Sequence, residues 1–329
     1  MIYLETGSAD PHFNLAFEEY VLLNRRQGDY LMLWQNENSI IIGQNQNTYA
    51  EINREYVEKN HVHVVRRSTG GGAVYHDLGN LNYSFITDDI SGGDTMFRMF
   101  TEPVVEALKS LGLDAGCSGR NDILVDGRKV SGIAQRHADG RILHHGTLLF
   151  QENLAAANEA LHVDTEKIRA KGIQSVRSRI ANISEYLDGR MTLPEFWEYI
   201  KNYFARSSYG GEGFVSGSLS EEELAEVRRI RKGKYDTWEW NYGKSWTADY
   251  TSKNRYDGGS IEVKAKLYHG RIEDIVFFGD FMSTQPLDEI CAKLKGCEFR
   301  PEAVGEVLAG YDLTEYFGKI KKDEIIALF

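Results

Sequence analysis

Cysteine is scarce in this sequence, and long apolar runs are absent. Only three of the 329 residues are cysteines (Cys117, Cys291 and Cys297), and none belongs to a CxxC pair. An odd number of unpaired cysteines argues against the disulfide framework of a small secreted protein. No stretch approaches the roughly 18 apolar residues of a membrane span, and the opening residues, MIYLE, carry no signal-peptide pattern. We therefore expect a cytoplasmic protein with no membrane partner.

Positive charge is also in short supply. The formal net charge is −11 at pH 7, which argues against sequence-independent nucleic-acid binding, because that needs a basic surface. A small basic pocket inside an acidic shell is still compatible with this balance. Two phosphate-binding motifs are missing as well, since the chain has neither a GxxxxGK(S/T) string nor a GxGxxG string. The P-loop and the Rossmann fold are therefore excluded.

Length and pattern predict two units that mix helices and strands. A chain of 329 residues is long enough for two domains. In the first part, helical spacing alternates with strand-like runs: helices are expected at 12–26, 51–60, 94–112, 193–206 and 220–232, and strands at 30–34, 39–43, 61–67, 81–86 and 147–150. The pattern changes near 244–252, after which we expect strands at 259–268 and 272–278, helices at 286–295, 301–309 and 313–317, and a lysine-rich tail. The expected domains are 1–246 and 247–329.

Three consecutive glycines mark the first candidate site. Arg66 and Arg67 end a β-branched run, Gly70 to Gly72 follow, and Ala73 to Tyr75 are apolar again. A glycine run lets another group approach bare main chain, and its N–H groups can form an anion-binding concavity. Arginine adds a charge that does not titrate away. The pattern favours a phosphate or carboxylate site in a strand–loop–strand arrangement, and an ordinary glycine turn is the alternative.

A tight hairpin marks the second candidate site. Asp126-Gly127 between two strand-like runs predicts a two-residue turn. The register then pairs Leu124 with Lys129 and Asp122 with Ser131, and places these four side chains on one face. An acid and an amine that are diagonal neighbours could hold a metal-bound nucleotide between them. A solvated surface ion pair is the alternative.

Histidine and basic clusters add weaker signals. His144 and His145 are adjacent, but neighbours on a strand point to opposite faces and no third ligand is suitably spaced. We therefore expect hydrogen-bonding residues and not a zinc site. Basic residues gather at 164–190, which predicts either a solvated face or a docking surface for an acidic protein.

Three strings in a fixed order carry a family resemblance. The segments RRSTGGGAVYHDLGNLNYSF, GRNDILVDGRKVSG and HHGTLLF together resemble the lipoate–protein ligase A family, and the resemblance covers essentially the whole chain. It implies an α+β fold: a catalytic domain of the biotin/lipoate ligase type, with mixed β-sheets flanked by helices, and a small α/β C-terminal accessory domain. It also implies an ATP-dependent ligase that converts lipoate to lipoyl-AMP, releases pyrophosphate and transfers the lipoyl group to a lysine of a lipoyl domain.

The same resemblance assigns roles to individual residues. Lys129 and Arg67 are expected to be the catalytic cations. The adenylate is expected to contact the residues Arg67, Gly72, Ala73, Val74, Tyr75, Asn80, Asn121, Asp122 and Lys129. Lipoate is expected to contact the residues Thr69, Gly72, Lys129, His145 and Thr147. Asp122 is the expected magnesium ligand, ATP and Mg²⁺ are the implied cofactors, and the implied acceptors are E2 subunits of 2-oxo-acid dehydrogenases and the glycine cleavage H protein.

This chemistry agrees with the residue types. Adenylation joins two anions, so fixed cations and loop amides lower the barrier where charge develops, and the mixed anhydride then needs only a positioned amine. An ATP-independent octanoyl or lipoyl transferase of the same fold stays the main alternative, with Cys117 as the candidate for a thioester in the catalytic domain. A biotin ligase has less support because its GRGRxG-type string is absent, and a non-catalytic binding protein would not need the Arg67, Asp122 and Lys129 set.

Overall fold

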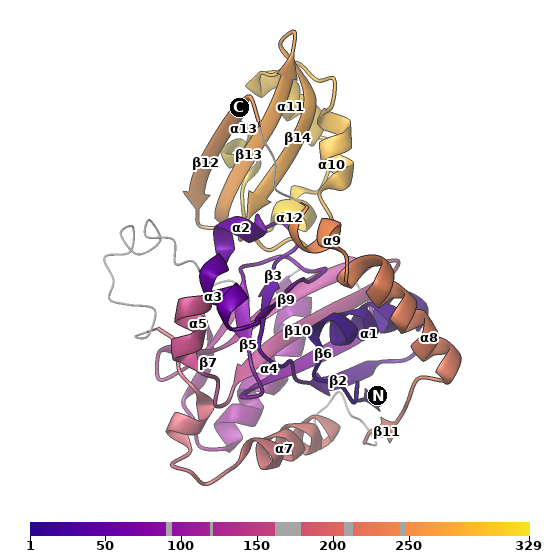
Figure 1. The fold of residues 1–329 in the computed structure, drawn as a ribbon, viewed down its shortest axis with the longest axis vertical. Coiled ribbons are helices and arrows are strands. Elements are labelled where there is room, and N and C mark those ends of the chain that lie inside the picture. The colour runs from indigo at the N-terminus through magenta and orange to yellow at the C-terminus, as the bar shows by residue number, and fades with distance from the viewer. Residues whose placement is uncertain (90–93, 119–120, 162–178, 207–212, 244–247) are drawn as a thin grey trace.

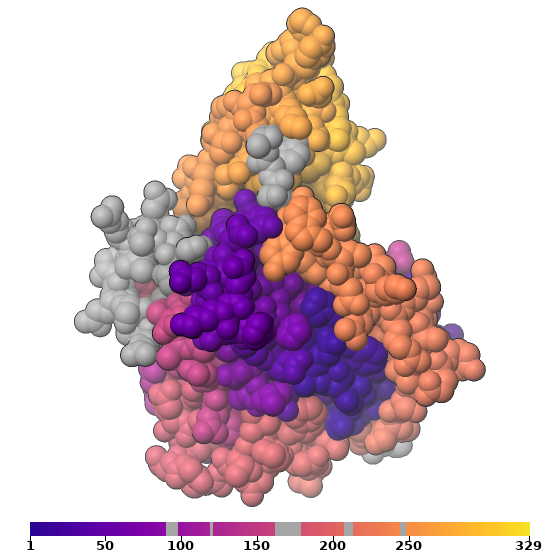
Figure 2. All heavy atoms as spheres, viewed as in Figure 1, coloured from indigo at the N-terminus to yellow at the C-terminus, as the bar shows by residue number. Residues whose placement is uncertain are grey.

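Two lobes of unequal size make up the fold (Figure 1). The computed structural model describes residues 1–89, 94–118, 121–161, 179–206, 213–243 and 248–329. The larger lobe comes from the residues up to 243, and residues 248–329 form a smaller lobe that protrudes from it in the space-filling view (Figure 2). The basic stretch at 164–190 lies mostly in 162–178, outside the described residues, so its proposed docking role stays a prediction.

An eight-stranded mixed sheet is the frame of the larger lobe. Its order is β11–β1–β2–β6–β10–β9–β8–β7, and the pairs β11–β1 and β1–β2 are parallel while the others are antiparallel. The strands are β1 (Ile2–Leu4), β2 (Tyr30–Trp34), β6 (Asn80–Asp88), β7 (Ala115–Ser118), β8 (Asp122–Val125), β9 (Arg128–Ala138), β10 (Arg141–Leu149) and β11 (Val215–Ser216). A second sheet of order β4–β3–β5 consists of β3 (Ser39–Ile42), β4 (His63–Arg66) and β5 (Val74–His76).

Helices cover both faces of the large sheet. The described helices of the larger lobe are α1 (Pro11–Asn24), α2 (Thr48–Glu51), α3 (Arg54–Lys59), α4 (Asp94–Ser110), α5 (Leu154–Ala160), α7 (Leu193–Arg206), α8 (Glu221–Ile230), α9 (Trp238–Tyr242) and the short helices η2 (Ile183–Tyr186) and η3 (Arg231–Tyr235). One face packs on α4 and α7 through a core that includes Phe85 and Phe204. The other face packs on α1 through Met32 and Leu143. Helix α1 begins at Pro11, one residue before the predicted start, and the Asp10 side chain caps it by accepting two of its first N–H groups.

The smaller lobe is a three-stranded antiparallel sheet backed by helices. Its strands β12 (Tyr250–Tyr256), β13 (Gly259–Tyr268) and β14 (Arg271–Gly279) pair in chain order, and α10 (Asp288–Leu294), α11 (Pro301–Leu308), α12 (Leu313–Phe317) and α13 (Lys322–Ile326) follow. Phe277, Phe281 and Phe317 lie in a core of its own. The sequence does not predict β12, because YTSKNRY offers few apolar residues in alternation. The expected lysine-rich tail forms α13 instead, held by the buried Ile325.

The strand that leaves the glycine loop is β5, which the sequence analysis does not include; the next predicted strand, at 81–86, was expected to leave the loop but lies in β6. Strands β4 and β5 both pair with β3, in parallel and antiparallel directions respectively. The loop therefore connects the two outer strands of the small sheet, and β6 belongs to the large sheet. The interval at 51–60 also differs from the prediction, since α2 ends at Glu51 and α3 begins only at Arg54.

The β8–β9 hairpin has a bulge that the sequence analysis misses. Its Asp-Gly turn has positive φ at both central residues, as predicted. Beyond Lys129, however, Ile123 pairs with Ser131 and Asp122 pairs with Gly132. Ser131 is fully buried opposite Ile123, so the prediction that it shares a face with Asp122 and Lys129 is wrong. A Cβ at position 132 would lie 3.1 Å from the Nζ of Lys129, and the bulge thus places a residue without a side chain beside the lysine.

Candidate active site

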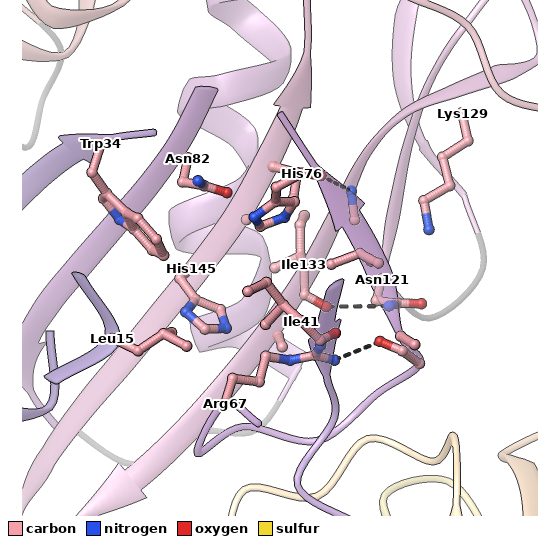
Figure 3. Close-up of a pocket in the computed structure, with 17 residues that line it drawn as sticks. Leu15, Trp34, Ile41, Arg67, His76, Asn82, Asn121, Lys129, Ile133 and His145 are labelled. Carbon is pink, nitrogen blue, oxygen red and sulfur yellow. Dashed lines mark hydrogen bonds between the residues drawn. The ribbon is translucent and has the colours of Figure 1, made fainter. Parts of the chain in front are cut away.

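A cavity of about 620 Å³, its open mouth included, lies between the two sheets of the larger lobe. Its walls come from α1, from β2, β6, β9 and β10 of the large sheet, and from the glycine loop, β3 and β5 of the small sheet (Figure 3). The lining residues are Leu15, Trp34, Ile41, Arg67, Gly72, Ala73, Val74, His76, Asn82, Asn121, Lys129, Gly132, Ile133, Ala134, His145, Gly146 and Thr147.

A lysine and an aspartate stand at the mouth of the cavity. The Nζ of Lys129 lies 2.7 Å from the Oδ1 of Asp122, and the two side chains are 29% and 35% exposed. The diagonal acid–amine pair predicted from the hairpin is therefore confirmed. Thr147 accepts a hydrogen bond from the N–H of Gly132 at 3.0 Å, which fixes the β9–β10 edge of the mouth. Such a half-exposed pair can exchange partners when an anion arrives.

The guanidinium of Arg67 braces the glycine loop. Its Nη2 donates to the carbonyls of Gly70 (2.6 Å) and Gly72 (2.9 Å), and its Nη1 donates to the carbonyl of Ile41 at 3.1 Å. Its Nε donates to the Oγ1 of Thr69 at 3.0 Å. Arginine has five N–H donors, so one Nη1–H is left for the cavity that Arg67 lines. Burial lowers the pKa of Arg67 to about 10, and the residue stays charged at neutral pH.

A chain of hydrogen bonds under the cavity floor leads from Arg67 to a buried carboxylate. Thr69 contacts the Nε2 of His145 at 2.8 Å, and the Nδ1 of His145 lies 2.9 Å from Glu18. Glu18 also accepts from the hydroxyl of Ser84 at 2.6 Å. Because a carboxylate only accepts, the imidazole proton belongs on Nδ1, and Nε2 accepts from Thr69. In this series of hydrogen bonds each residue donates to the next in the direction of Glu18, and this fixes the rotamers of His145 and Thr69.

The inner end of the cavity is closed and carries no full charge. Trp34, His76 and Asn82 are 3%, 3% and 2% exposed. Burial, together with the neighbouring Arg67 and His145, lowers the pKa of His76 to about 3. The imidazole is therefore neutral at physiological pH. The cavity thus runs from a charged mouth to an uncharged end.

Arg66 plays a different part from its neighbour. It is fully buried and does not line the cavity. Burial, and then the charge of Arg67, lower its pKa to about 10. Its described acceptors are the carbonyls of Gly43, Gln44, Gln46, Trp240 and Asn241 and the hydroxyl of Thr48. Arg66 therefore fastens the polar loop that follows β3 to helix α9 and is a structural residue.

The smaller lobe touches the glycine loop directly. The N–H of Gly71 donates to the carbonyl of Phe281 at 3.1 Å, and the N–H of Gly279 donates to the carbonyl of Asn45 at 2.9 Å. The Asn45 amide donates to the hydroxyl of Ser283 at 2.7 Å. Gly71 has a φ of 90°, a conformation that favours glycine. The position of the smaller lobe and the shape of the loop are therefore coupled.

Most residues that the sequence singles out meet at this cavity. Arg67, Gly72, Ala73, Val74, Asn121, Lys129, His145 and Thr147 all line it, and Asp122 lies beside Lys129. Three others do not line it. Thr69 lies beneath the floor, Asn80 is fully buried and donates to Asn82, and Tyr75 points into the core of the small sheet with its hydroxyl on Asn38.

The remaining residue expectations have mixed outcomes. His144 and His145 lie on opposite faces of β10, as predicted, since His145 lines the cavity while His144 accepts from Gln135 at 2.8 Å. Among the described residues no group of three or more His, Cys, Asp or Glu side chains could hold a metal ion. Cys117 is exposed and does not line the cavity. Partial desolvation and Glu102 raise the pKa of its thiol, which disfavours the thiolate.

Sequence reasoning missed the inner half of the cavity. Leu15, Trp34, Ile41, His76 and Asn82 line it, but none was proposed as a site residue. His76 and Asn82 fall inside the string that carries the family resemblance, so polar residues at buried strand positions were the available signal. Trp34 and Ile41 look like ordinary core residues in the sequence, and only the facing of the two sheets brings them to the cavity.

Comparison with known proteins places the chain in a family. The family described as "Lipoyl protein ligase A/B catalytic domain" matches residues 10–205, and "Bacterial lipoate protein ligase C-terminus" matches residues 245–329. The chain is 46% identical over 331 aligned positions to the lipoate-protein ligase LplJ of Bacillus subtilis, covering 100% of this chain and 99% of the relative. The chain belongs to the lipoate–protein ligase family. It is accordingly a ligase with the α+β fold that the resemblance implied.

Two solved structures extend the comparison of this ligase. It is similar to LipL1 of P. falciparum in complex with lipoate, with a TM-score of 0.81, 25% identity, and coverage of 99% of this chain and 97% of the other. It is also similar to lipoate-protein ligase A bound with ATP, with a TM-score of 0.64, 30% identity, and coverage of 74% and 97%. None of the described helices of the ligase is long and apolar enough to cross a membrane.

Proposed function

We propose that this ligase activates lipoate with ATP to lipoyl-AMP, releasing pyrophosphate, and then transfers the lipoyl group to a specific lysine of a lipoyl domain. The observation that carries the proposal is the polarity of the cavity. A cation and a carboxylate occupy its half-exposed mouth, and uncharged, buried side chains close its inner end. A fatty-acid-like carboxylate fits such a site with its charge at the mouth, because burying an unpaired carboxylate is costly.

Lys129 is the residue we assign to the adenylation step. The carboxylate oxygen of lipoate attacks the α-phosphorus of ATP, a new P–O bond forms, and the bond to pyrophosphate breaks. An ammonium at the mouth attracts both anions and stabilises the charge that grows on the α-phosphate oxygens. Its compact charge suits a shifting set of oxygens better than a planar guanidinium does. The main chain of Gly72, Ala73, Val74 and Tyr75 is assigned to one side of the adenylate.

Asp122 and Asn121 are assigned to the nucleotide side of the mouth. One carboxylate is compatible with Mg²⁺, because this ion commonly takes one or two carboxylates and completes its shell with phosphate oxygens and water. The ion would neutralise charge on the departing pyrophosphate. Lys129 already lies 2.7 Å from Asp122, so the same contact would orient the carboxylate before the nucleotide arrives.

Arg67 and its hydrogen-bond chain are assigned to holding the glycine loop in shape. Four donated bonds tie its guanidinium to Ile41, Thr69, Gly70 and Gly72, which leaves one N–H for a phosphate or carboxylate oxygen. Thr69 then contributes through Arg67 and not by touching lipoate. Asn80 contributes in the same indirect way by donating to Asn82. His145 and Thr147 are assigned to the wall beside the lipoyl chain.

Transfer needs no nucleophile from the enzyme. The lysine amine of the acceptor attacks the lipoyl carbonyl, the anhydride bond to AMP breaks, and the amine loses a proton. The mixed anhydride is already activated, so positioning supplies the remaining rate. Exposed Cys117, with its raised thiol pKa and its place outside the cavity lining, gives the transferase alternative little support. We further assign residues 1–246 to a catalytic domain and 247–329 to an accessory domain, and the cytoplasm as the location.

One incubation tests the proposed function. The ligase is mixed with ATP, Mg²⁺, lipoate and a purified apo-lipoyl domain from an E2 subunit or H protein, and the intact mass of the acceptor is measured. We expect the mass to rise by one lipoyl group only when ATP is present. In a parallel incubation a lipoylated donor protein replaces ATP and lipoate, and a rise in acceptor mass there alone would assign the transferase function instead.

A further inference from the structure

Two hydrogen-bond donors at the closed end of the cavity have no partner in the part of the chain that the structure describes. The Nε2 of His76 and the Nδ2 of Asn82 are buried, and neither finds an acceptor among the described residues. Both residues line the cavity, Asn82 from the large sheet beside Trp34 and His76 from the small sheet (Figure 3). Buried donors are nearly always paired in folded proteins, and an unpaired one costs free energy. The closed end therefore has room and donors for an acceptor that the ligand brings.

Neighbouring amides hold the His76 ring in place. The Nδ2 of Asn14 donates to the Oδ1 of Asn36 at 3.0 Å, which orients the Asn36 amide. The Nδ2 of Asn36 then faces the Nδ1 of His76 at 3.0 Å. Since Nδ1 must accept this bond, the ring proton is on Nε2, and the neutral His76 presents an N–H to the cavity. Asn14 and Asn36 are both fully buried, so this arrangement is part of the fold.

Asn82 lies on the large sheet, opposite His76, and a neighbour on its own strand fixes its amide. The Nδ2 of Asn80 donates to its Oδ1 at 3.0 Å, which leaves the Nδ2 of Asn82 without a described acceptor. On β6 it pairs with Trp34 of β2 and with Thr147 of β10. Its amide therefore belongs to the large sheet, while His76 belongs to the small one. The two donors approach the cavity from different walls.

We propose that His76 and Asn82 recognise the ring sulfurs of lipoate and so favour a dithiolane over a plain hydrocarbon end. The inference rests on the proposed function, which puts the lipoate carboxylate beside Lys129 at the mouth and the ring at the closed end. Divalent sulfur is a weak hydrogen-bond acceptor. An acid such as octanoate ends in a methyl group and has no acceptor at that end. A hydrocarbon in the same place leaves both donors buried and unpaired, which is the kind of mismatch that gives strong discrimination.

A hydrocarbon isostere tests the inference without altering the protein. The acid 5-cyclopentylpentanoate has the skeleton of lipoate with both sulfurs replaced by methylene groups. The rate of pyrophosphate exchange into ATP is measured with lipoate, octanoate and this isostere. We expect kcat/KM for the isostere to be lower than for lipoate by about 4- to 100-fold, from roughly two- to tenfold for each unpaired donor. Equal values for lipoate and the isostere would overturn the inference.

Variants of the two donors sharpen the test. His76→Phe and Asn82→Leu should each reduce the ratio of lipoate to isostere kcat/KM by about two- to tenfold, and His76→Gln, which keeps an N–H donor, should retain most of it. His144→Phe is the matched control, because His144 is also a buried histidine whose pKa burial lowers to about 3, but it lies on the other face of β10. Losses that are equal for both acids in the two donor variants would contradict a role in recognition.

The exchange assay separates this inference from the proposed function. If neither lipoate nor octanoate supports pyrophosphate exchange, the ligase function itself fails. If lipoate and the isostere support exchange equally well in the unaltered protein, the function stands and only the role of His76 and Asn82 fails. Thermal melting of each variant, with and without lipoate, shows whether a lower rate comes from a misfolded chain.

Discussion

Cationic side chains lie both at the mouth of the cavity and in the glycine loop, but they differ in exposure and in the number of hydrogen-bond acceptors around them. Lys129 at the mouth is 29% exposed, and among the described residues its ion-pair partner is Asp122. Arg66, where the loop begins, is fully buried, and its described acceptors are five carbonyls and one hydroxyl. Arg67 is intermediate, since it lines the cavity while four of its bonds go to the loop.

This difference indicates which cation can bind a ligand and which one stabilises the fold. A half-exposed ammonium can leave one carboxylate for another anion at low cost, because exposed ion pairs contribute about 0–1 kcal/mol. A buried guanidinium whose neutral acceptors come from several segments cannot leave without stranding those acceptors. Two adjacent arginines in the sequence thus have unequal roles, and the lysine 62 positions after Arg67 is the better candidate for a reacting cation.

The largest expected effect on stability comes from Arg66. Arg66→Met keeps much of the apolar volume but removes the donors that serve the carbonyls of Gly43, Gln44 and Gln46. We expect a loss of about 3–5 kcal/mol in the free energy of unfolding. Denaturant titration followed by circular dichroism measures it. Lys129→Ala is the comparison, with an expected change below about 1 kcal/mol. Similar losses in the two variants would remove the distinction drawn between them.

Acid should destabilise the ligase through its buried histidines. The folded-state pKa values of His76 and His144 are lowered to about 3, whereas the unfolded value is about 6.5. The unfolded chain therefore binds more protons between these values, and stability falls as the pH drops below about 6.5. Between about pH 6.5 and 5.5 the expected loss is about 1 kcal/mol for each histidine.

His144→Phe isolates one of the two contributions. The pKa of Glu152 is raised well above its usual range by burial and by Asp77, so this group acts in the opposite sense and favours the folded state as the pH falls. The difference between the variant and the unaltered protein cancels that background. The free energy of unfolding is measured by denaturant titration at both pH values. Its loss between about pH 6.5 and 5.5 should be about 1 kcal/mol smaller in the variant than in the unaltered protein. Identical pH dependence would show that His144 titrates normally.

Gly70→Ala probes the contact between the loop and the smaller lobe. A Cβ at Gly70 would lie 2.5 Å from the backbone nitrogen of Ser283, so the lobe must shift. Overpacking of this kind costs about 1–3 kcal/mol. We expect faster limited proteolysis between the lobes and a larger radius of gyration in solution scattering. Gly233→Ala is the matched control, because a Cβ there meets nothing within 4 Å. An unchanged Gly70→Ala protein would mean that the loop and the lobe are not coupled.

The smallest expected effect belongs to Cys117. Cys117→Ser should leave the rate of lipoate transfer to the acceptor within about twofold, because the exposed thiol lies outside the cavity lining and surface substitutions change little. The rate is followed by the acceptor mass over time. A large loss of transfer, with adenylation intact, would revive a thioester intermediate.

Local signals in the sequence were sufficient for the mouth of the site. The Asp-Gly turn predicts the hairpin, and the hairpin places Asp122 near Lys129. The bulge was not predicted, because the spacing of apolar residues is the same with or without one extra residue. Gly132 was the available sign, since a glycine inside a strand often marks a bulge or a close approach.

The closed end could not be predicted in the same way. Trp34, His76 and Asn82 come from β2, β5 and β6, and their meeting depends on how the small sheet packs against the large one. That packing is set by many buried side chains and by residues such as Arg66 that connect distant segments. No local spacing encodes it, so periodicity alone finds the strands but not the faces that they share.

The most direct test of the account is pyrophosphate exchange by a Lys129→Ala variant. Exchange into ATP that depends on lipoate reports adenylation alone, without an acceptor protein. We expect the variant to fold normally and to lose at least about 100-fold in exchange rate, since the ammonium stabilises charge that develops in the transition state. Lys109→Ala, which removes an exposed lysine paired with Glu106, is the control and should exchange at the normal rate. Near-normal exchange by Lys129→Ala would contradict the account.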